Sequence, residues 1–193
     1  MRNSYLKYYT KHTYLAPFCF LVDFFTEIEP RKRLSIWNRL SDYISILLNR
    51  DKNLLLFHKQ INQSLLSQSS EYSHYDYGEG YFYQSLALAN VSGFRNTEER
   101  VNQLGLKELV KNKSVLDIGC NTGFLLLSLA DSYDQGFGFD LNPYIVEIAN
   151  KTKLYLDIKN TTIITSSFEN LKLQASYDVV LSFANHSTFD KNT

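Results

Sequence analysis

The sequence predicts an α/β protein in which a mostly parallel sheet with flanking helices follows a helical N-terminal extension. From residue 113 onward, short apolar runs alternate with segments of helical period, a pattern typical of right-handed strand–helix–strand units. Before residue 67, apolar residues recur at helical spacing instead. The chain has 193 residues, of which 44% are hydrophobic, so it is long enough to bury a substantial core.

Two amphipathic helices are expected in the N-terminal part, at residues 34–48 and 54–66. The apolar stripe of the first consists of Leu34, Trp37, Leu40, Ile44 and Leu47, and that of the second of Phe57, Ile61 and Leu65. Core packing is the better explanation for both stripes. Residues 64–80 then change to Ser, Gln, Tyr and Gly, which favours a linker or a lid. We therefore expect a helical extension or lid at 1–75 and an α/β domain at 76–193.

The elements of the α/β part follow from their apolar patterns and flanking residues. A helix is expected from Thr97 to about Val110, with Asn96 or Thr97 as its cap and two glutamates near its positive end. Short apolar runs predict strands at residues 114–118, 136–139, 162–165 and 178–183. Helical spacing predicts helices between the first three of these strands, at 124–130 and 143–149.

Charge is distributed unevenly along a chain whose formal net charge is zero. Residues 1–75 contain 10 Lys/Arg and 6 Asp/Glu, and the remainder contains 10 and 14. The mildly basic first part is much weaker than the basic stripe of a dedicated nucleic-acid binder. A solvated surface best explains this excess of positive charge, and contact with an anionic substrate is the alternative.

Cysteine use and apolar runs bear on the compartment. Cys19 and Cys120 lie far apart in unlike contexts, so the sequence indicates neither a disulfide framework nor a metal site, and a reducing cytoplasm fits best. The apolar run at residues 14–25 contains Pro17 and Asp23. It is too short and too interrupted for a membrane span, and a buried helix is expected there.

The loop after the first strand carries the chemistry of the predicted site. It reads Asp117-Ile118-Gly119-Cys120-Asn121-Thr122-Gly123, and a helix is expected to begin at once. In a parallel sheet, ligands bind at the carboxyl ends of strands where the strand order reverses, and two glycines allow a sharp turn or a close approach to a ligand. Asp140 follows the second strand, where an acid can accept the hydroxyls of a ribose. A nucleoside cofactor is therefore predicted.

The glycine spacing decides between nucleoside cofactors. A dinucleotide site requires G-x-G-x-x-G, whereas Gly119 and Gly123 are four apart and bulky Phe124 follows. The phosphate-binding pattern G-x-x-x-x-G-K-[ST] does not occur in the sequence either. Neither a pyrophosphate-binding site of a dinucleotide nor a P-loop nucleotide site is expected.

Residues 115–123 resemble the first motif of the class I S-adenosylmethionine (SAM) dependent methyltransferases, and Asp140 resembles the acid of their second. The likeness covers about residues 80–193 and implies a Rossmann-like fold with SAM as cofactor. It implies that the cofactor contacts Asp117, Gly119, Cys120, Asn121, Gly123, Asp140, Leu141, Ser167 and Phe168. At the adenine position the family has an acid before an apolar residue, whereas this chain has Ser167-Phe168-Glu169. The Ser167 hydroxyl can replace the acid in part, and Phe168 either packs on the adenine or is a core residue.

Residues 178–183 resemble the family's fourth motif, whose end faces the transferred methyl group. Ala184-Asn185-His186 follows, which differs from the Asn-Pro-Pro-aromatic signature of nucleic-acid amino-group methylation. His186 is the candidate general base for a hydroxyl acceptor, with a structural role as the alternative, and Asn185 is a candidate substrate contact.

Further candidates for substrate contacts precede the first strand. They are Tyr83, Gln84 and Arg95, near a Gly-x-Arg-x-Thr-Glu-x-Arg pattern that ends at Arg100 and is similar to one in some small-molecule and RNA-modifying members. Arg95 can pair with the SAM carboxylate or with an anionic substrate. The alternative is a surface ion pair with Glu98 or Glu99.

The family's sheet has seven strands, but the sequence ends ten residues after the fourth. We therefore expect either a fragment of a longer protein or a partner chain that completes the sheet, since an apolar strand edge would otherwise be exposed. The expected reaction is methyl transfer to an oxygen of a small metabolite, sugar or lipid-linked glycan. The alternatives are a tRNA-modifying methyltransferase and a non-catalytic SAM-binding or scaffold protein.

Overall fold

A computed structural model of the chain describes residues 41–42, 44–48, 50–67, 82–171 and 176–183. All of them lie in one of the two units of the chain, Ser35–Thr193. The predicted boundary near residue 75 falls between the described ranges and stays a prediction.

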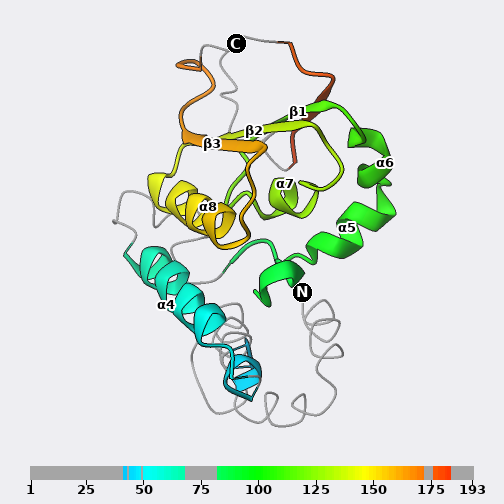
Figure 1. Ribbon diagram of the computed structural model, residues 1–193. Coiled ribbons are helices and arrows are strands. Elements are labelled where there is room, and N and C mark those ends of the chain that lie inside the picture. Colours follow the sequence, from blue (N-terminus) through cyan, green and yellow to red (C-terminus); the bar gives the residue numbers. More distant parts are fainter. Residues whose placement is uncertain (1–40, 43, 49, 68–81, 172–175, 184–193) are drawn as a thin grey trace, which may run out of the picture. The chain divides into compact units, whose positions relative to one another are not determined.

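The core of the unit is a sheet of four parallel strands (Figure 1). The strands are β1 (Ser114–Ile118), β2 (Gln135–Asp140), β3 (Thr161–Thr165) and β4 (Val179–Leu181). Their order is β3-β2-β1-β4, so β1 lies between β2 and β4. Asp117 in β1 is level with Gly138 in β2 and Leu181 in β4. The predicted α/β class and its parallel sheet are confirmed, and all four strands occur at the predicted places.

Two helices connect the first three strands and lie against one face of the sheet (Figure 1). They are α7 (Phe124–Ser128) after β1 and α8 (Pro143–Tyr155) after β2. Asn142 caps α8, since its side-chain oxygen accepts a hydrogen bond from the Tyr144 amide at 3.0 Å. α8 extends six residues beyond the predicted end at Ala149. Buried side chains of α7, α8 and the strands form a shared apolar core.

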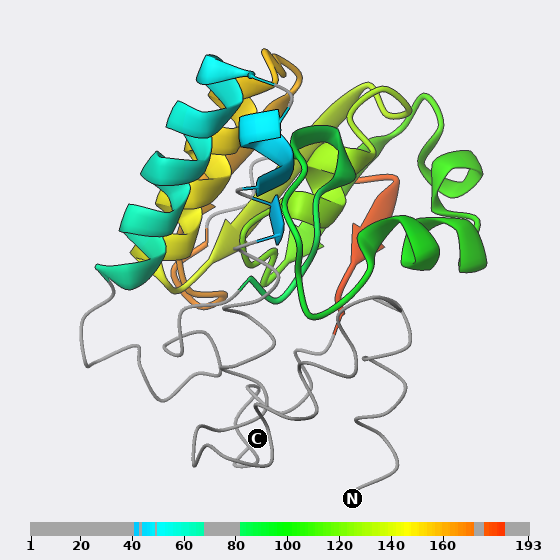
Figure 2. The same cartoon turned by 90° about the horizontal axis from the view of Figure 1, so that it is seen from below.

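A further helix, α4 (Lys52–Leu66), packs on the outer side of α8 (Figures 1 and 2). Phe57 stacks on Tyr155 with ring centroids 4.3 Å apart, and Lys151 Nζ donates to Ser64 Oγ at 2.7 Å. The predicted stripe of Phe57, Ile61 and Leu65 is buried in one cluster with Phe124 of α7. The second amphipathic helix is therefore confirmed.

The first predicted stripe is wrong in its phase where the structure describes it. Residues 41–42 and 44–48 are helical, but Ile44 and Leu47 are 48% and 47% exposed. Ile46 is 1% exposed and joins the cluster of α4 instead. The remainder of that stripe, at 34–40, lies outside the described residues.

The single helix predicted from Thr97 to Val110 is two helices, α5 (Thr97–Gln103) and α6 (Leu106–Val110). Gly105 separates them with a left-handed backbone, φ 59°, which a continuous α-helix does not contain. Asn96 caps α5 as one of the two predicted caps, because its side-chain oxygen accepts from the Glu99 amide at 3.1 Å.

No helix in the described ranges is both long and apolar enough to cross a membrane.

Candidate cofactor site

The site lies at the carboxyl end of β1, where the strand order reverses. β2 and β3 follow on one side of β1 and β4 on the other (Figure 1). The chain proceeds from β1 through β2 to β3 on one side and then crosses to β4 on the other, and open α/β sheets bind ligands at such a reversal of strand order. The loop after β1, residues 119–123, is called the glycine loop below.

The backbone of the glycine loop is unusual and firmly held. Gly119, Asn121 and Gly123 have positive φ angles of 64°, 55° and 67°. The Cys120 amide donates to the Phe139 carbonyl of β2 at 2.9 Å. A Cβ atom at Gly123 would lie 2.7 Å from Ile163 Cδ1 and 3.3 Å from Ala149 Cβ, so the loop approaches β3 and α8 as closely as a glycine permits.

Asp140 joins the ends of the first two strands. Its Oδ2 accepts from the Asn121 amide of the glycine loop at 2.9 Å, and its Oδ1 accepts from the Asn142 amide at 3.1 Å. Each carboxylate oxygen has a further lone pair. The acid therefore holds the glycine loop and keeps acceptor capacity for a ligand.

Asp117 lies buried one strand away from Asp140. Burial raises the pKa of Asp117 to about 7, the negative charge of Asp140 raises it too, and the positive charge of Arg100 opposes the rise. Burial also raises the pKa of Asp140, while backbone amides, first that of Asn142, act against it. Two neighbouring buried carboxyl groups favour a ligand that carries positive charge.

The glycine loop also contains polar atoms without partners. Asn121 Nδ2 and Thr122 Oγ1 are buried and form no hydrogen bond within the described structure. The oxygen of Asn121 is engaged, because it accepts from the Thr122 amide at 2.7 Å. Unsatisfied buried polar groups are costly, so a ligand with polar atoms would stabilise this loop.

The predicted substrate residues in the segment before α5 differ from one another in burial. Gln84 is buried, and its Oε1 accepts from the Leu125 amide in α7 at 3.2 Å. Arg95 is exposed, with its guanidinium 5.7 Å from the Tyr83 ring centroid. In the described ranges Arg95 forms no ion pair with Glu98 or Glu99, so the surface-pair alternative is not realised there.

Arg100 is a site residue to which the sequence pattern alone assigned no role. Its guanidinium lies 5.1 Å from the ring centroid of Phe183, just after β4, and its charge acts on Asp117. It is thus beside the ends of β1 and β4. Arg100 follows Thr97, a buried residue of the same helix, by three positions. Residues three apart lie on the same face of a helix, so this spacing could have indicated that Arg100 faces the sheet.

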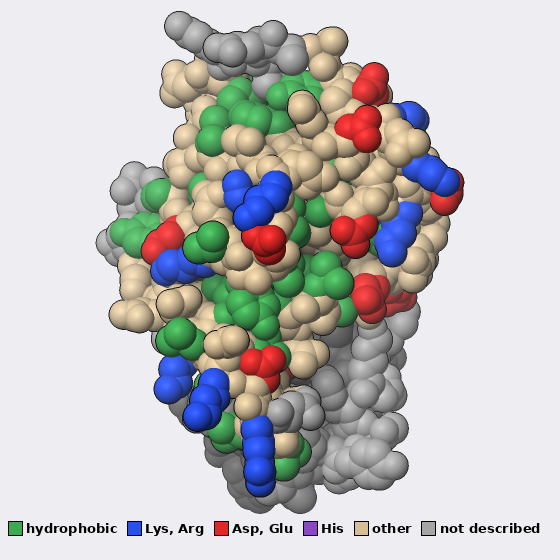
Figure 3. Space-filling model, in the orientation of Figure 1, with side chains coloured by type: hydrophobic (Ala, Val, Ile, Leu, Met, Phe, Trp, Pro, Cys, Tyr) green, Lys and Arg blue, Asp and Glu red, His purple; other side chains and the backbone are tan. Residues whose placement is uncertain are grey.

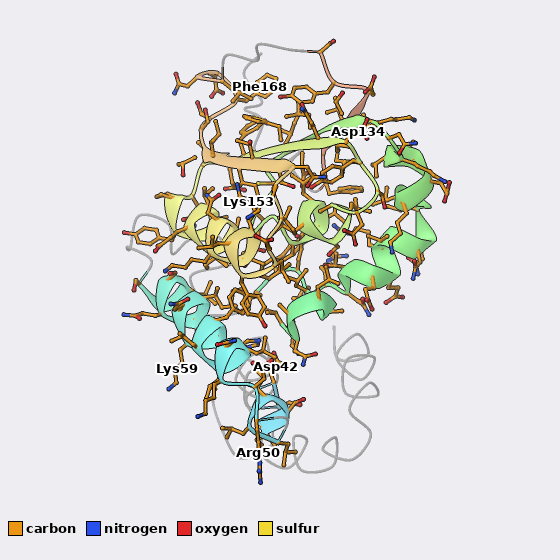
Figure 4. All side chains as sticks on the ribbon, in the orientation of Figure 1. Asp42, Arg50, Lys59, Asp134, Lys153 and Phe168 are labelled. Carbon is orange, nitrogen blue, oxygen red and sulfur yellow. The ribbon has the colours of Figure 1, made fainter. Side chains whose placement is uncertain are left out.

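The predicted adenine-side residues follow the ends of β2 and β3. The Ser166 amide donates to the Asp140 carbonyl at 3.0 Å, which keeps the two ends together. Phe168 is 52% exposed, with its ring 6.4 Å from that of Phe139, so it is not a buried core residue (Figure 4). Leu141 is exposed, and Ser167 Oγ accepts from the Asn170 amide at 3.2 Å. Asn185 and His186 lie outside the described residues.

Comparison with known proteins finds a family model that matches the part of the chain containing the sheet. Residues 109–193 match the family model described as a methyltransferase domain. The match bears out the predicted resemblance to the class I SAM-dependent methyltransferases for this part of the chain. None of the curated proteins that were compared matches the chain.

Solved structures similar to the chain cover only part of it. The YcgJ protein from Bacillus subtilis is 23% identical over 42% of this chain and 37% of its own, with a TM-score of 0.38. A SAM-dependent methyltransferase from Thiobacillus denitrificans, solved with S-adenosyl-L-homocysteine, is 23% identical over 45% and 37%, with a TM-score of 0.40. A dimethyladenosine transferase from Plasmodium falciparum is 20% identical over 44% and 30%, with a TM-score of 0.40. The matched part of the chain spans about a third of the length of each of these three structures.

Proposed function

We propose that the glycine loop and the ends of β1 and β2 bind SAM, and that the whole protein transfers its methyl group to an acceptor. The observation that carries this proposal is the pair of buried carboxyl groups, Asp117 and Asp140, beside a loop with unsatisfied polar atoms. SAM supplies what such a site lacks: positive charge, ribose hydroxyl donors and a methyl group activated by the sulfonium.

The residues present fit this cofactor in chemical type. Asp140 has acceptor capacity for ribose hydroxyls, and Asp117 in its ionised form suits an ammonium group. The unpartnered amide of Asn121 and hydroxyl of Thr122 offer further hydrogen bonds. We assign the remaining contacts by family resemblance, with the glycine loop lining the methionine part and Leu141, Ser167 and Phe168 on the adenine side.

Arg100 is a better candidate than Arg95 for the carboxylate of the cofactor. The charge of Arg100 acts on Asp117, whereas Arg95 is exposed above the Tyr83 ring. An arginine can bind a carboxylate through two parallel hydrogen bonds. In this proposal Tyr83 and Arg95 are assigned to contact with the methyl acceptor.

For the acceptor we propose an oxygen of a small metabolite, sugar or lipid-linked glycan. The sequence after β4 lacks the Asn-Pro-Pro-aromatic signature, and His186 is available to take the proton of a hydroxyl. On the face that Figure 3 shows, Lys and Arg side chains are interspersed with Asp and Glu, which gives little support to the tRNA alternative. We place the protein in the cytoplasm, because Cys19 and Cys120 lie far apart in unlike contexts and indicate no disulfide framework.

Calorimetric titration of SAM into the 193-residue chain tests the cofactor proposal. Replacing Asp140 with Ala should weaken binding by at least tenfold, because a charged hydrogen-bond acceptor is lost. Asp134→Ala is the matched control, since Asp134 is an exposed acid just before the opposite end of β2 (Figure 4). The control should bind like the wild type. Equal SAM binding by the wild type and Asp140→Ala would refute the ribose assignment, and a wild type without binding would refute the proposed function.

A further inference from the structure

The segment at residues 82–96, before α5, reaches the start of α7 through two buried side chains. The ring of Phe82 lies 5.7 Å from that of Phe124, the first residue of α7. Gln84 Oε1 accepts from the amide of Leu125, the second residue, at 3.2 Å. Both contacts join parts of the chain about 40 residues apart, directly beyond the glycine loop.

Gln84 is itself held in one position by its backbone. It forms a parallel bridge with Arg95, in which the Arg95 amide donates to the Tyr83 carbonyl at 2.7 Å and the Ser85 amide donates to the Arg95 carbonyl at 2.9 Å. A Cβ atom at Gly93 would lie only 2.2 Å from the carbonyl carbon of Gln84. Only glycine permits this approach, so the turn and the Gln84 backbone are fitted to each other.

The turn is anchored a second time from outside the segment. Asp42 accepts from the Ser92 amide at 2.8 Å and from the Ser92 hydroxyl at 2.6 Å. Gln84 therefore extends from a braced backbone, and its amide oxygen is directed at a fixed point. Such bracing is what a side chain needs in order to orient another element.

The first turn of α7 needs a partner from elsewhere. Its N-cap is Gly123, which has no side chain to accept the free amide hydrogens. Gln84 supplies that acceptor at Leu125, while Asp140 binds the amide of Asn121 in the middle of the glycine loop. Side chains remote in sequence thus hold the loop at its centre and the helix that directly follows it.

We propose that Gln84 is a positioning residue, which holds the glycine loop in its binding conformation by capping α7 from the upstream segment. This assignment rests on the proposed SAM site. It differs from the expected direct substrate contact, because the amide oxygen is already engaged with Leu125. A loop held in advance binds its ligand more tightly, since less conformational freedom is lost on binding.

Three variants of the 193-residue chain separate positioning from general stability. Gln84→Met keeps the length of the side chain and removes the acceptor, whereas Gln84→Glu keeps an acceptor and places negative charge near a helix N-terminus, which favours it. Ser85→Ala is the control. It removes an acceptor in the same segment, for the Thr97 amide at 3.1 Å, that does not reach α7.

The measurements are hydrogen exchange of the Leu125 amide by NMR and the SAM dissociation constant. Gln84→Met should speed the exchange and raise the dissociation constant, each by about tenfold. Gln84→Glu should stay within about threefold of the wild type in both, and Ser85→Ala should leave the Leu125 exchange unchanged.

Two outcomes overturn the assignment. One is Leu125 exchange in Gln84→Met equal to that in Ser85→Ala. The other is faster exchange in Gln84→Met with unchanged SAM affinity, which would make Gln84 a cap without influence on binding. A wild type that does not bind SAM refutes the proposed function and the positioning role together, while the exchange data still report whether Gln84 caps α7.

Discussion

Gly123 is constrained by its backbone conformation and by its neighbours. Its φ of 67° is strained for any residue with a side chain, and a Cβ atom would lie 2.7 Å from the buried Ile163 side chain. We expect Gly123→Ala to lower the free energy of unfolding by about 2–3 kcal/mol, measured by urea denaturation. The φ strain contributes about half of this loss.

Gly105→Ala is the control for that measurement. Gly105 has a similar φ of 59°, but nothing lies within 4 Å of the position that a Cβ atom would occupy there. It should therefore show only the cost of the left-handed conformation, about 1 kcal/mol. Equal losses in the two variants would mean that the Ile163 contact is relieved without cost.

Individual site residues were predictable to different degrees. The glycine loop and Asp140 follow a strand–turn–helix–strand pattern within 24 residues of sequence, and the structure joins them by a direct hydrogen bond. The contact of Gln84 with Leu125 spans 41 residues and depends on how the upstream segment folds. Local sequence carries no signal for it, so its role emerged only from the structure.

At the scale of elements, the packing of α4 on α8 depends on Phe57. Its side chain is buried and stacked on Tyr155, and removing such a ring leaves a cavity. We expect Phe57→Ala to lower the free energy of unfolding by about 3–5 kcal/mol. Lys59→Ala on the exposed side of the same helix (Figure 4) should change it by less than about 0.5 kcal/mol. Equal effects of the two substitutions in chemical denaturation would contradict this packing.

The elements themselves followed from sequence where the apolar pattern was strong. All four strands and α8 begin within one residue of the predicted start, because each strand is a short run rich in apolar and β-branched residues, bounded by polar residues or glycine. The break at Gly105 and the inward position of Ile46 were missed. At Gly105 the apolar pattern continues past the glycine, so the sequence does not show that the helix breaks there. At Ile46 the neighbouring residues are equally apolar, so only tertiary packing decides which of them is buried.

At the scale of the whole molecule, Asp117 makes stability depend on pH. Its folded pKa of about 7 lies above the unfolded value near 4. Below about pH 4 Asp117 is protonated in both the folded and the unfolded state, so its burial does not lower the free energy of unfolding. As pH rises from about 4 to about 7, the unfolded chain releases the proton first, so the free energy of unfolding falls.

Replacing Asp117 with Asn removes this pH dependence. We expect the stability of Asp117→Asn relative to the wild type to rise by about 4 kcal/mol between pH 4 and pH 8, since each unit of pKa shift corresponds to about 1.4 kcal/mol. The measurement is urea denaturation of both proteins across this range. A constant difference between them would show that Asp117 titrates normally. The variant should also bind SAM more weakly, because it cannot ionise.

β4 joins β1 across a long stretch of the chain. Asp178, just before β4, accepts from the amide and the hydroxyl of Ser114 at 2.8 and 2.7 Å, although the two residues are 64 positions apart. The other strands pair in chain order at shorter separations, so we expect β4 to be the last of the four strands to add, because closing its loop costs the most entropy. During synthesis, β1 would then have one unpaired edge until β4 has emerged, and we expect edge-to-edge aggregation to be most favourable in that interval.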